Sequence, residues 1–475
     1  MIRHDFLDEL RNKIRAKKDS VAAKREQWIR SNPYYYKQLI NTLHYIIPEG
    51  SSILNVGCST GFLLNELKPS RGVGVDGSAE QINIAKQQWP NLKFFDQEPE
   101  SCDVEGTFDF ILIYGVEDIV DVKSVLDAVK KNCHRDTRLI VCYYNFLWEP
   151  LVTLAEKCRI RLPQTVHNWF SGSDINNIME HSGFDPIHIK KLVLWPFNIP
   201  GLSYLLNRFA GRLPVFHHLT MMRVAVARPV PEPMDKPSVS IVIPCRNEEG
   251  NIESAVERIP QLGSHTEIIF CDDKSTDGTA DKVREMQEKY PDKDIKLVDG
   301  PGICKADNVW TGFDAATCDI LMILDADLTV IPEELPYFYE AIASGRGEFI
   351  NGSRLVYPMH EEAMRICNII GNKFFSLLFS YILDTPIKDT LCGTKVVTRE
   401  NFRKIKAIRG CWGVKDRWGD YELIFGAAKN HLKIVDLPVH YMERTYGETK
   451  MTNRFKNGWI MLRFSLASMF GIKFH

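Results

Sequence analysis

The chain has 475 residues, of which 44% are hydrophobic and 25% charged, and its formal net charge is -2. This length exceeds one ordinary hydrophobic core and predicts two or three domains. The near-neutral charge argues against a dedicated nucleic-acid binder, so we expect no nucleic-acid partner. No uncharged apolar run reaches the roughly 18–20 residues needed to cross a bilayer, and we therefore expect no spanning segment.

Both ends of the chain are basic. The first thirty-two residues carry nine Lys/Arg against five Asp/Glu, and the tail from Tyr441 carries six against two. Either end could favour an anionic membrane surface, although solvated helix faces explain the N-terminal stretch equally well. The polar start predicts no secretory leader, and twelve scattered cysteines without a Cys-x-x-Cys pair predict reduced thiols. We expect a cytoplasmic location, with peripheral attachment at the inner face of the membrane left open.

A proline-rich stretch divides the sequence. Four prolines fall within residues 228–237, and proline both fixes φ and removes a hydrogen-bond donor. This stretch therefore predicts a semi-rigid linker. We expect an N-terminal helical extension over 1–34, an α/β domain over 35–228, the linker over 229–237, and a second α/β domain over 238–475.

The first domain begins with a nucleoside-binding pattern. Short apolar runs predict strands at 52–56, 72–75, 94–96, 108–113 and 139–143. A Gly-x-x-x-Gly turn from Gly57 to Gly61 follows the first strand, and Asp76 ends the second. Glycines let a ligand approach the backbone, and a carboxylate at the next strand tip can accept both hydroxyls of a ribose. The turn alone would fit a purely structural strand–helix connection equally well.

With Asn168-Trp169-Phe170-Ser171 and Ser182-Gly183-Phe184 downstream, these residues resemble class I S-adenosylmethionine-dependent methyltransferases over roughly 35–228. The resemblance implies a Rossmann-like sheet and S-adenosyl-L-methionine as cofactor. It places Gly57, Cys58 and Gly61 on the methionine side, Asp76 at the ribose and Asp96 near the adenine. The chain departs from the family at Asn55, which stands where an acidic residue is usual. A non-catalytic binding module is therefore the alternative.

Other features of the first half have two interpretations. Glu117 and Asp118 follow the fourth strand and could face a methyl acceptor, but we favour a solvated loop or helix cap. His167 and Trp169 could shape an acceptor pocket, although a lone histidine is more often structural. The apolar stretch 192–222 predicts either insertion into a headgroup layer or a helical cover.

In the second half, acidic clusters follow predicted strands. The strand at 239–243 leads to Asn247 and Glu248, which we expect to cap a helix beginning near Asn251. An Asp-rich turn (272–277) follows the second strand, Lys305 follows the third, and an Asp-Ala-Asp segment (325–327) follows the run at 319–323. Two carboxylates one residue apart at a strand end can hold a divalent cation against a diphosphate. The pattern predicts a nucleotide-activated substrate.

This order closely resembles family 2 glycosyltransferases of the GT-A fold over roughly 236–450, above all dolichyl- or polyprenyl-phosphate mannosyl and glucosyl synthases. The resemblance rests on the segments 272–279, 325–328, 352–354, 389–394 and 443–450. It implies nucleotide-sugar contacts at Pro244, Asn247, Glu248, Asp272, Asp273, Lys305 and Asp325. It also implies Mg²⁺ or Mn²⁺ at Asp325 and Asp327, with Arg354, Arg365, Arg444 and Lys450 around the acceptor phosphate.

Two departures affect that expectation. Thr329-Val330 stand where the family often has Gln or Ser followed by His, which leaves a third metal contact open to water. The C-terminal run 459–474 is apolar and basic, and with 374–379 it could hold an acceptor at the bilayer surface; core packing is the alternative.

The resulting hypothesis is a two-domain enzyme that combines a methyltransferase with a metal-dependent inverting glycosyltransferase. The expected acceptor is a polyprenyl phosphate, and the expected role is in cell-envelope glycan or glycoconjugate synthesis. One rival hypothesis is transfer to a sugar hydroxyl of a glycan, which needs a general base. The other is a non-catalytic binding role for the first half.

Overall fold

The computed structural model describes residues 2–158, 168–358, 366–444, 446 and 454–474. The chain divides into two compact units, the first reaching Pro231 and the second covering Glu232–Lys473. The division falls within the proline-rich stretch. Each unit is built on its own seven-stranded sheet.

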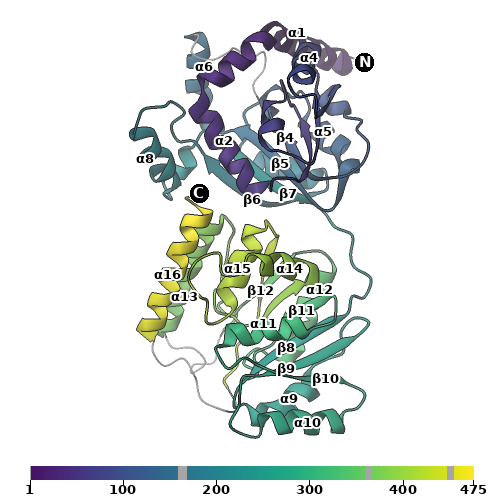
Figure 1. Ribbon diagram of the computed structural model, residues 1–475, viewed down its shortest axis with the longest axis vertical. Helices are drawn as coiled ribbons and strands as arrows, with labels where there is room; N and C mark the ends of the chain where they lie inside the picture. The colour runs from purple at the N-terminus through teal and green to yellow at the C-terminus, as the bar shows by residue number, and fades with distance from the viewer. Residues whose placement is uncertain (1, 159–167, 359–365, 445, 447–453, 475) are drawn as a thin grey trace. The chain divides into compact units, whose positions relative to one another are not determined.

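The first unit is a mixed sheet with helices on both faces (Figure 1). Its strands run in the order β3-β2-β1-β4-β5-β7-β6, with β7 antiparallel to both of its neighbours. The strands are β1 (Ser52–Val56), β2 (Arg71–Asp76), β3 (Lys93–Asp96), β4 (Phe108–Ile113), β5 (Cys133–Tyr144), β6 (Phe184–Leu192) and β7 (Met222–Pro229). The helices are α1 (Ile2–Ser31), α2 (Pro33–Ile46), α3 (Phe62–Glu66), α4 (Ala79–Gln88), α5 (Val122–Val129), α6 (Glu149–Lys157), α7 (Gly172–His181) and α8 (Leu202–Arg208). The structure contains all five strands predicted for this half.

Side chains of the central strands alternate between the two faces of the sheet and so contribute to two hydrophobic cores. Ile53 of β1 belongs to a cluster with side chains of α2, α3 and α4, whereas Leu54 and Val56 belong to one with side chains of α5 and α7. Successive strand residues point to opposite faces, so a wholly apolar strand buries both. The Rossmann-like sheet expected from the sequence is confirmed.

The turn after β1 needs glycine for a specific steric reason. Gly57 has φ 76°, and a Cβ there would lie 2.1 Å from the carbonyl oxygen of Tyr114. No L side chain can occupy that space. The turn therefore lies directly against the end of β4.

The stretch 192–222 forms α8 and two short 3₁₀ turns. Tyr34 of α2 donates to the Ser203 carbonyl oxygen at 2.8 Å and accepts from Asn207 at 3.0 Å, so α8 is fixed to α2 by polar contacts. Its outer side chains Tyr204 and Leu205 are exposed. The segment is thus a helical cover with an apolar outer surface, and headgroup insertion stays a prediction.

The second unit has strand order β10-β9-β8-β11-β13-β12-β14. Its strands are β8 (Val239–Cys245), β9 (Thr266–Asp272), β10 (Asp294–Asp299), β11 (Ile320–Ile323), β12 (Phe349–Ser353), β13 (Lys395–Thr398) and β14 (Ile434–Pro438). The strands β10, β9, β8 and β11 are parallel, and β13 is antiparallel to β11 and β12. The chain moves from β8 to one side for β9 and β10 and to the other for β11. The carboxyl ends of β8 and β11 are therefore the switch point at which such sheets bind ligands.

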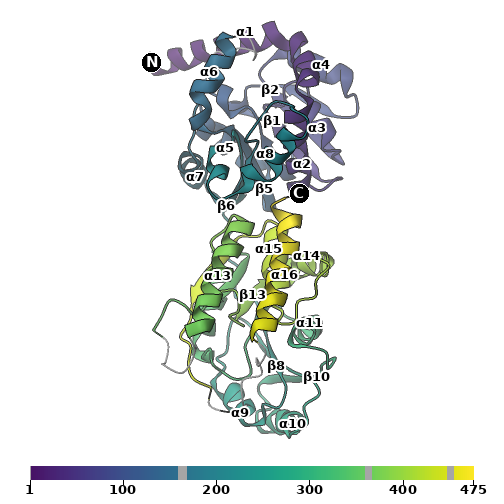
Figure 2. The same cartoon turned by 90° about the vertical axis from the view of Figure 1, so that its left-hand side faces the viewer.

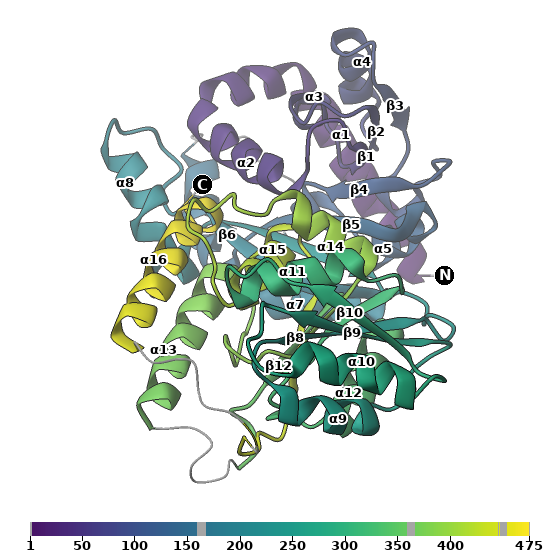
Figure 3. The ribbon, with the colours of Figure 1, turned by 60° about the horizontal axis from the view of Figure 1, so that its bottom comes forward.

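Helices cover both faces of this sheet as well, and Figure 3 shows α9 and α10 on one face and α11 on the other. The helices are α9 (Glu249–Arg258), α10 (Thr279–Lys289), α11 (Lys305–Ala315), α12 (Leu335–Ala343), α13 (Ile366–Leu383), α14 (Arg399–Ala407), α15 (Asp420–Lys429) and α16 (Arg454–Ile472). The expected cap of α9 is wrong in detail. The helix begins at Glu249, its N-cap Glu248 makes no side-chain cap bond, and Asn247 instead accepts from the Thr276 amide at 2.8 Å.

The long helices α13 and α16 lie side by side (Figure 2). Phe379 of α13 and Phe464 of α16 both contact Tyr421 and Phe425 of α15, so one side of the pair is ordinary core. The opposite side is exposed and apolar, with Leu377 74% and Trp459 66% exposed. Within the described helices, none combines the length and hydropathy that a bilayer crossing requires.

Candidate functional site

The candidate site of the second unit is assembled at the carboxyl ends of β8, β9 and β11. Asp273, just past β9, is buried, and its Oδ1 accepts from the Gly302 amide at 2.6 Å. Its own amide donates to the Cys245 carbonyl oxygen at the end of β8. These bonds hold the turns after three neighbouring strands together. Asp272 plays a more local part, because its carboxylate accepts from the Ser275 amide in its own turn at 3.2 Å.

Lys305, the first residue of α11, meets Asp325 just after β11. The Lys305 Nζ lies 2.5 Å from Asp325 Oδ1. Burial is the largest single influence and raises the pKa of Asp325, but the charge and hydrogen bond of Lys305 together with the charges of Arg354 and Lys395 outweigh burial, so the pKa lies below its ordinary value. Asp325 is therefore an anion over the whole physiological range.

Asp327 is held from two directions. Its Oδ1 accepts from the Thr329 hydroxyl at 2.8 Å and its Oδ2 from Arg444 at 2.5 Å. Arg444 also lies 3.9 Å from Glu248 Oε1. Thr329, which departs from the family pattern, thus orients the second carboxylate of the Asp-x-Asp segment. Arg444 connects that segment to the turn after β8.

A close-packed loop closes the site above Asp325. A Cβ on Gly393 would lie 2.1 Å from Asp325 Oδ2, so the loop backbone rests directly on the carboxylate. The loop is anchored by Asp389, which is fully buried and accepts from Arg354 Nε at 2.7 Å and Nη2 at 2.9 Å. Asn372 of α13 adds a third bond at 2.6 Å. Arg354 also lies over the Tyr441 ring, at 5.1 Å from its centroid.

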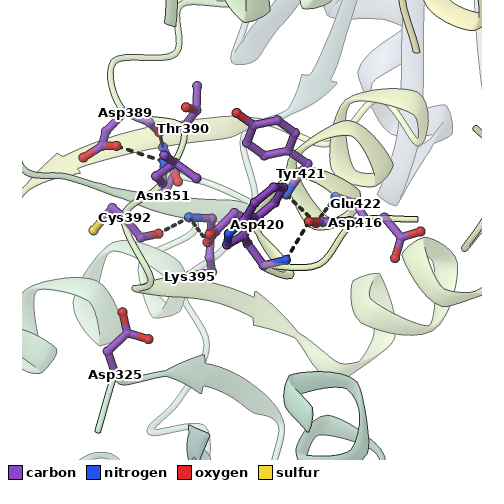
Figure 4. Close-up of polar contacts among 12 residues, drawn as sticks. Asp325, Asn351, Asp389, Thr390, Cys392, Lys395, Asp416, Asp420, Tyr421 and Glu422 are labelled. Atoms are coloured by element: carbon purple, nitrogen blue, oxygen red, sulfur yellow. Dashed lines mark hydrogen bonds and ion pairs between the residues drawn. The ribbon is translucent and has the colours of Figure 1, made fainter. Parts of the chain in front are cut away.

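A second charged layer lies behind this loop (Figure 4). Lys395 of β13 is fully buried and pairs with Asp420 of α15 at 3.0 Å. Burial raises the pKa of Asp420, and attraction by Lys395 opposes this only in part. Asp416 is also buried and accepts from the Tyr421 amide at 2.8 Å and the Glu422 amide at 3.0 Å. Burial raises the pKa of Asp416 to about 6.

Sequence reasoning missed Lys395, Asp416 and Asp420. Their one sequence signal was the pair of acids around Trp418-Gly419 before an apolar helix, which is too common to single out. By contrast, the structure brings Glu248, Asp273, Lys305, Asp325, Asp327 and Arg444 together as grouped from the sequence. Pro244 lies within β8 next to this end of the sheet. Arg365 and Lys450 lie outside the described residues.

The donor set at the Asp-x-Asp segment fits a divalent cation only in part. Asp325 and Asp327 supply two carboxylates, and no cluster of three or more His, Cys, Asp or Glu with metal-site geometry occurs in the described ranges. Mg²⁺ is commonly held by one or two carboxylates together with substrate phosphates and water. The two residues therefore fit a cation that arrives with a diphosphate, and not a closed all-protein site.

The first unit holds a cavity of about 430 Å³ over the carboxyl ends of its parallel strands. Gly57, Ser59 and Asp76 line it on one side. Asp76 is 1% exposed, and its carboxylate accepts from the Ser59 amide at 3.0 Å and the Ser78 amide at 3.1 Å. Lys18 of α1 reaches the same carboxylate at 3.4 Å. An anion held by two backbone donors at a strand tip suits recognition of a ribose.

Other predicted cofactor residues lie around this cavity and do not line it. Cys58 and Gly61 are on the buried side of the turn, and Asp96 is exposed at the end of β3. Asn55 is buried and donates to the Leu112 carbonyl oxygen at 3.0 Å, which ties β1 to β4. The unusual amide thus has a structural bond within the sheet.

The favoured interpretation of Glu117 and Asp118 is wrong. Both residues line the cavity, and Glu117 is only 4% exposed. Glu117 Oε1 accepts from the Tyr144 amide at 2.9 Å, which draws this carboxylate inward from the short 3₁₀ turn after β4. Trp169 is half-buried beyond this turn, and His167 lies outside the described residues.

Each half of the chain matches a known protein family. Residues 28–189 match the family model for a methyltransferase domain, and residues 240–406 match that for glycosyl transferase family 2. The chain therefore consists of a methyltransferase-family domain followed by a family 2 glycosyltransferase domain, and both families are transferases.

Individual relatives cover only parts of the chain. A dolichol-phosphate mannosyltransferase of Pyrococcus furiosus is 39% identical over 120 residues, 25% of this chain and 33% of the relative. A low-salt glycan biosynthesis hexosyltransferase of Haloferax volcanii is 26% identical over 250 residues, 50% of this chain and 55% of the relative. The chain thus spans between a third and somewhat over half of these proteins. An S-adenosylmethionine-dependent methyltransferase structure from Thermotoga maritima has a TM-score of 0.37 at 16% identity, covering 45% of this chain and 99% of that one.

Asp416 predicts a pH dependence of stability. An unfolded aspartate ionises near pH 3.9, whereas folded Asp416 ionises near pH 6. Between these values the folded state holds the extra proton, so the free energy of unfolding falls as pH rises, by up to about 3 kcal/mol. The free energy of unfolding can be measured at several pH values by urea denaturation, with hydrogen exchange of α15 peptides as the probe. We expect Asp416→Asn to remove the decrease with rising pH. The matched control Asp292→Asn, at an exposed position, should keep it; an unchanged slope in Asp416→Asn would contradict the assignment.

Gly393→Ala should turn the Asp325 carboxylate away from Lys305, because the new Cβ takes the place of Oδ2. We expect nucleoside diphosphates with Mg²⁺ to bind about tenfold more weakly, or ~1.4 kcal/mol, in calorimetry. Gly371→Ala in α13 is the control, since its Cβ would meet nothing within 4 Å. Equal affinities for the two variants would show that the loop does not position Asp325.

Proposed function

We propose that the second unit transfers a sugar from a nucleotide sugar to a polyprenyl phosphate, with inversion and with a divalent cation. The observation that carries this proposal is the convergence of paired charges at the switch point of the sheet. The pairs Lys305 with Asp325 and Arg444 with Asp327 bring three separate segments of the chain together. The similarity to the dolichol-phosphate mannosyltransferase of Pyrococcus furiosus, 39% identical over 120 residues, supports the proposed acceptor.

The paired cations suit a site that awaits a diphosphate. Lys305 and Arg444 now satisfy the two carboxylates. The diphosphate offers Lys305 a stronger anionic partner and the acceptor phosphate offers one to Arg444, so both cations can move to phosphate oxygens while the carboxylates face a metal ion. Mg²⁺ or Mn²⁺ at Asp325 and Asp327 would offset the charge that builds on the leaving nucleoside diphosphate. Asp273, fixed by Gly302, would bind the base or ribose.

The acceptor side needs positioning more than proton transfer. A lipid phosphate is already an ionised nucleophile, so orientation and electrostatic stabilisation suffice. Arg444 and Arg354 are the described cations proposed to bind it, together with Arg365 and Lys450. Asp389 binds two nitrogens of Arg354 and fixes the plane of its guanidinium, which favours directed binding of an oxyanion.

An apolar surface for the lipid tail is available on the same unit. The exposed sides of α13 and α16 carry Phe374, Leu377, Trp459 and Phe470. Aromatic and aliphatic side chains on paired helices can insert into the headgroup boundary of a bilayer. We therefore propose peripheral membrane association through this surface and a role in glycoconjugate synthesis at the cytoplasmic face.

For the first unit we propose S-adenosyl-L-methionine binding and methyl transfer. Support comes from the cavity over Gly57 and from the buried Asp76, which two backbone amides hold in place. The methyl group would be presented near the end of β4, where Tyr114 and Glu117 line the cavity. A non-catalytic binding role is the alternative, and absence of cofactor binding in calorimetry would support it.

A sugar hydroxyl is the second candidate acceptor, and Asp420 is the observation that favours it. The raised pKa of Asp420, due first to burial, suits a general base. Asp420 is, however, only 5% exposed and paired with Lys395. Transfer to glycan hydroxyls that is lost in Asp420→Asn while donor binding survives would support this candidate.

Asp325→Asn should abolish sugar transfer. With a panel of nucleotide sugars, a short polyprenyl phosphate and Mg²⁺ or Mn²⁺, we expect a chloroform-soluble product whose rate of formation falls at least about a hundredfold in the variant. A chelator should have the same effect on the unmodified protein.

Asp281→Asn is the matched control, because Asp281 is exposed on α10 and contacts only Arg284 among the described residues. It should retain full transfer. Donor hydrolysis without lipid product, or transfer to glycan hydroxyls alone, would contradict the polyprenyl-phosphate assignment.

Asp76→Asn should weaken binding of S-adenosylhomocysteine. Loss of the charged acceptor removes hydrogen bonds to the ribose hydroxyls, so the dissociation constant in calorimetry should rise about ten- to a hundredfold. Asp127→Asn, at the exposed end of α5, should bind as the unmodified protein does. If the unmodified protein binds no S-adenosylhomocysteine, the first unit is a binding module of another kind.

A further inference from the structure

The helix α1 crosses the carboxyl ends of the strands in the first unit. Arg15 pairs with Glu98 just after β3, and Lys18 reaches Asp76 at the tip of β2. Seven residues of helix from Lys18 to Arg25 advance ~10 Å, and two strand spacings also measure ~10 Å. In the order β2-β1-β4, that distance places Arg25 above β4.

One face of α1 forms the roof of the cavity. Ile14, Lys18, Val21, Arg25 and Trp28 line it at intervals of three or four residues, as one helix face requires. The family match begins only at residue 28. Most of this roof therefore lies before the residues that the family model matches.

Aromatic side chains line much of the same cavity, among them Trp28, Tyr35, Tyr36, Tyr114, Tyr144 and Trp148. Burial is the main cause that raises the pKa of Tyr35 and of Tyr114, so their phenols stay neutral. A neutral aromatic wall of this kind binds the apolar body of a ligand.

Arg25 is a charged side chain among these aromatic residues of the cavity wall. Its Nε is buried without a hydrogen-bond partner, and its guanidinium forms no ion pair with any described residue. Interaction with Tyr36, and to a smaller extent with Asp118 on the cavity wall, raises the pKa of Arg25 well above its ordinary value. A buried guanidinium nitrogen without a hydrogen-bond partner is unfavourable. Its five donors suit the oxygens of a carboxylate or phosphate.

We propose that Arg25 binds an oxyanion of the methyl acceptor, whose apolar body lies against the aromatic wall. This inference rests on the proposed methyltransferase function of the same cavity. The oxyanion belongs to the acceptor, and not to the cofactor, because Arg25 lies beyond the Gly57 turn beside Tyr114 and Tyr144. The acceptor is thus an amphipathic acid, and either a carboxylate or a phosphate supplies the required chemistry.

The test is calorimetry on the full chain saturated with S-adenosylhomocysteine. The probes are 6-phenylhexanoate, 6-phenylhexyl phosphate and the uncharged 6-phenylhexanol, which share one apolar body. We expect at least one anion to bind about tenfold more tightly than the alcohol. The tighter anion identifies carboxylate or phosphate as the preferred headgroup.

Variants assign that preference to Arg25. Arg25→Gln should bind all three probes equally, and Arg25→Lys, which keeps the charge without the planar fork, should retain part of the preference. Lys24→Gln is the matched control, since it removes one positive charge from the exposed face of the same helix. Affinity for S-adenosylhomocysteine should stay within about twofold in all three variants.

Two results would overturn the inference. One is an equal affinity of the unmodified protein for the anions and the alcohol. The other is a loss of S-adenosylhomocysteine binding in Arg25→Gln, which would assign Arg25 to the cofactor carboxylate. Failure of the unmodified protein to bind S-adenosylhomocysteine at all would instead contradict the proposed methyltransferase function. The two hypotheses therefore fail in distinguishable ways.

Discussion

Carboxylates at the carboxyl ends of parallel strands must be compensated, and both units of this chain compensate them with cations from distant segments. Lys18 forms an ion pair with Asp76 in the first unit. In the second unit, Lys305 pairs with Asp325 and Arg444 pairs with Asp327. Strand ends point their side chains toward a ligand, so unpaired anions there would repel one another and any phosphate. Each pairing keeps the site intact without substrate and leaves cations where anionic ligands bind.

Local sequence determined much of this arrangement. Apolar runs placed the central strands, and the acids that follow those runs had to lie at one edge of each sheet. Asp76, Asp273, Asp325 and Asp327 were predicted for that reason. The sequence pattern predicts the glycines of the turn after β1. The reason for Gly57 belongs to the tertiary structure, because any Cβ there would clash with the Tyr114 carbonyl oxygen just past β4.

The residues that escaped prediction depend on contacts over long sequence separations. Lys395 meets Asp420 only because β13 is antiparallel beside β11 and α15 begins next to it. Glu117 appeared to be a loop acid, yet the Tyr144 amide draws it into the cavity. Arg25 looked like one of nine basic residues in a polar helix. Only its position over β4 distinguishes it from Lys24 beside it in the sequence.

Two contacts of α1 with the sheet fix the length of helix that lies between them. Its rise from Lys18 to Arg25 equals the width of two strand spacings, so the contacts at β2 and over β4 hold together only at one separation. One inserted residue between them would shift Arg25 by ~1.5 Å and turn it by ~100° out of the cavity. Substitutions on the outer face of α1 can therefore be tolerated freely, whereas changes in its length between these two positions cannot.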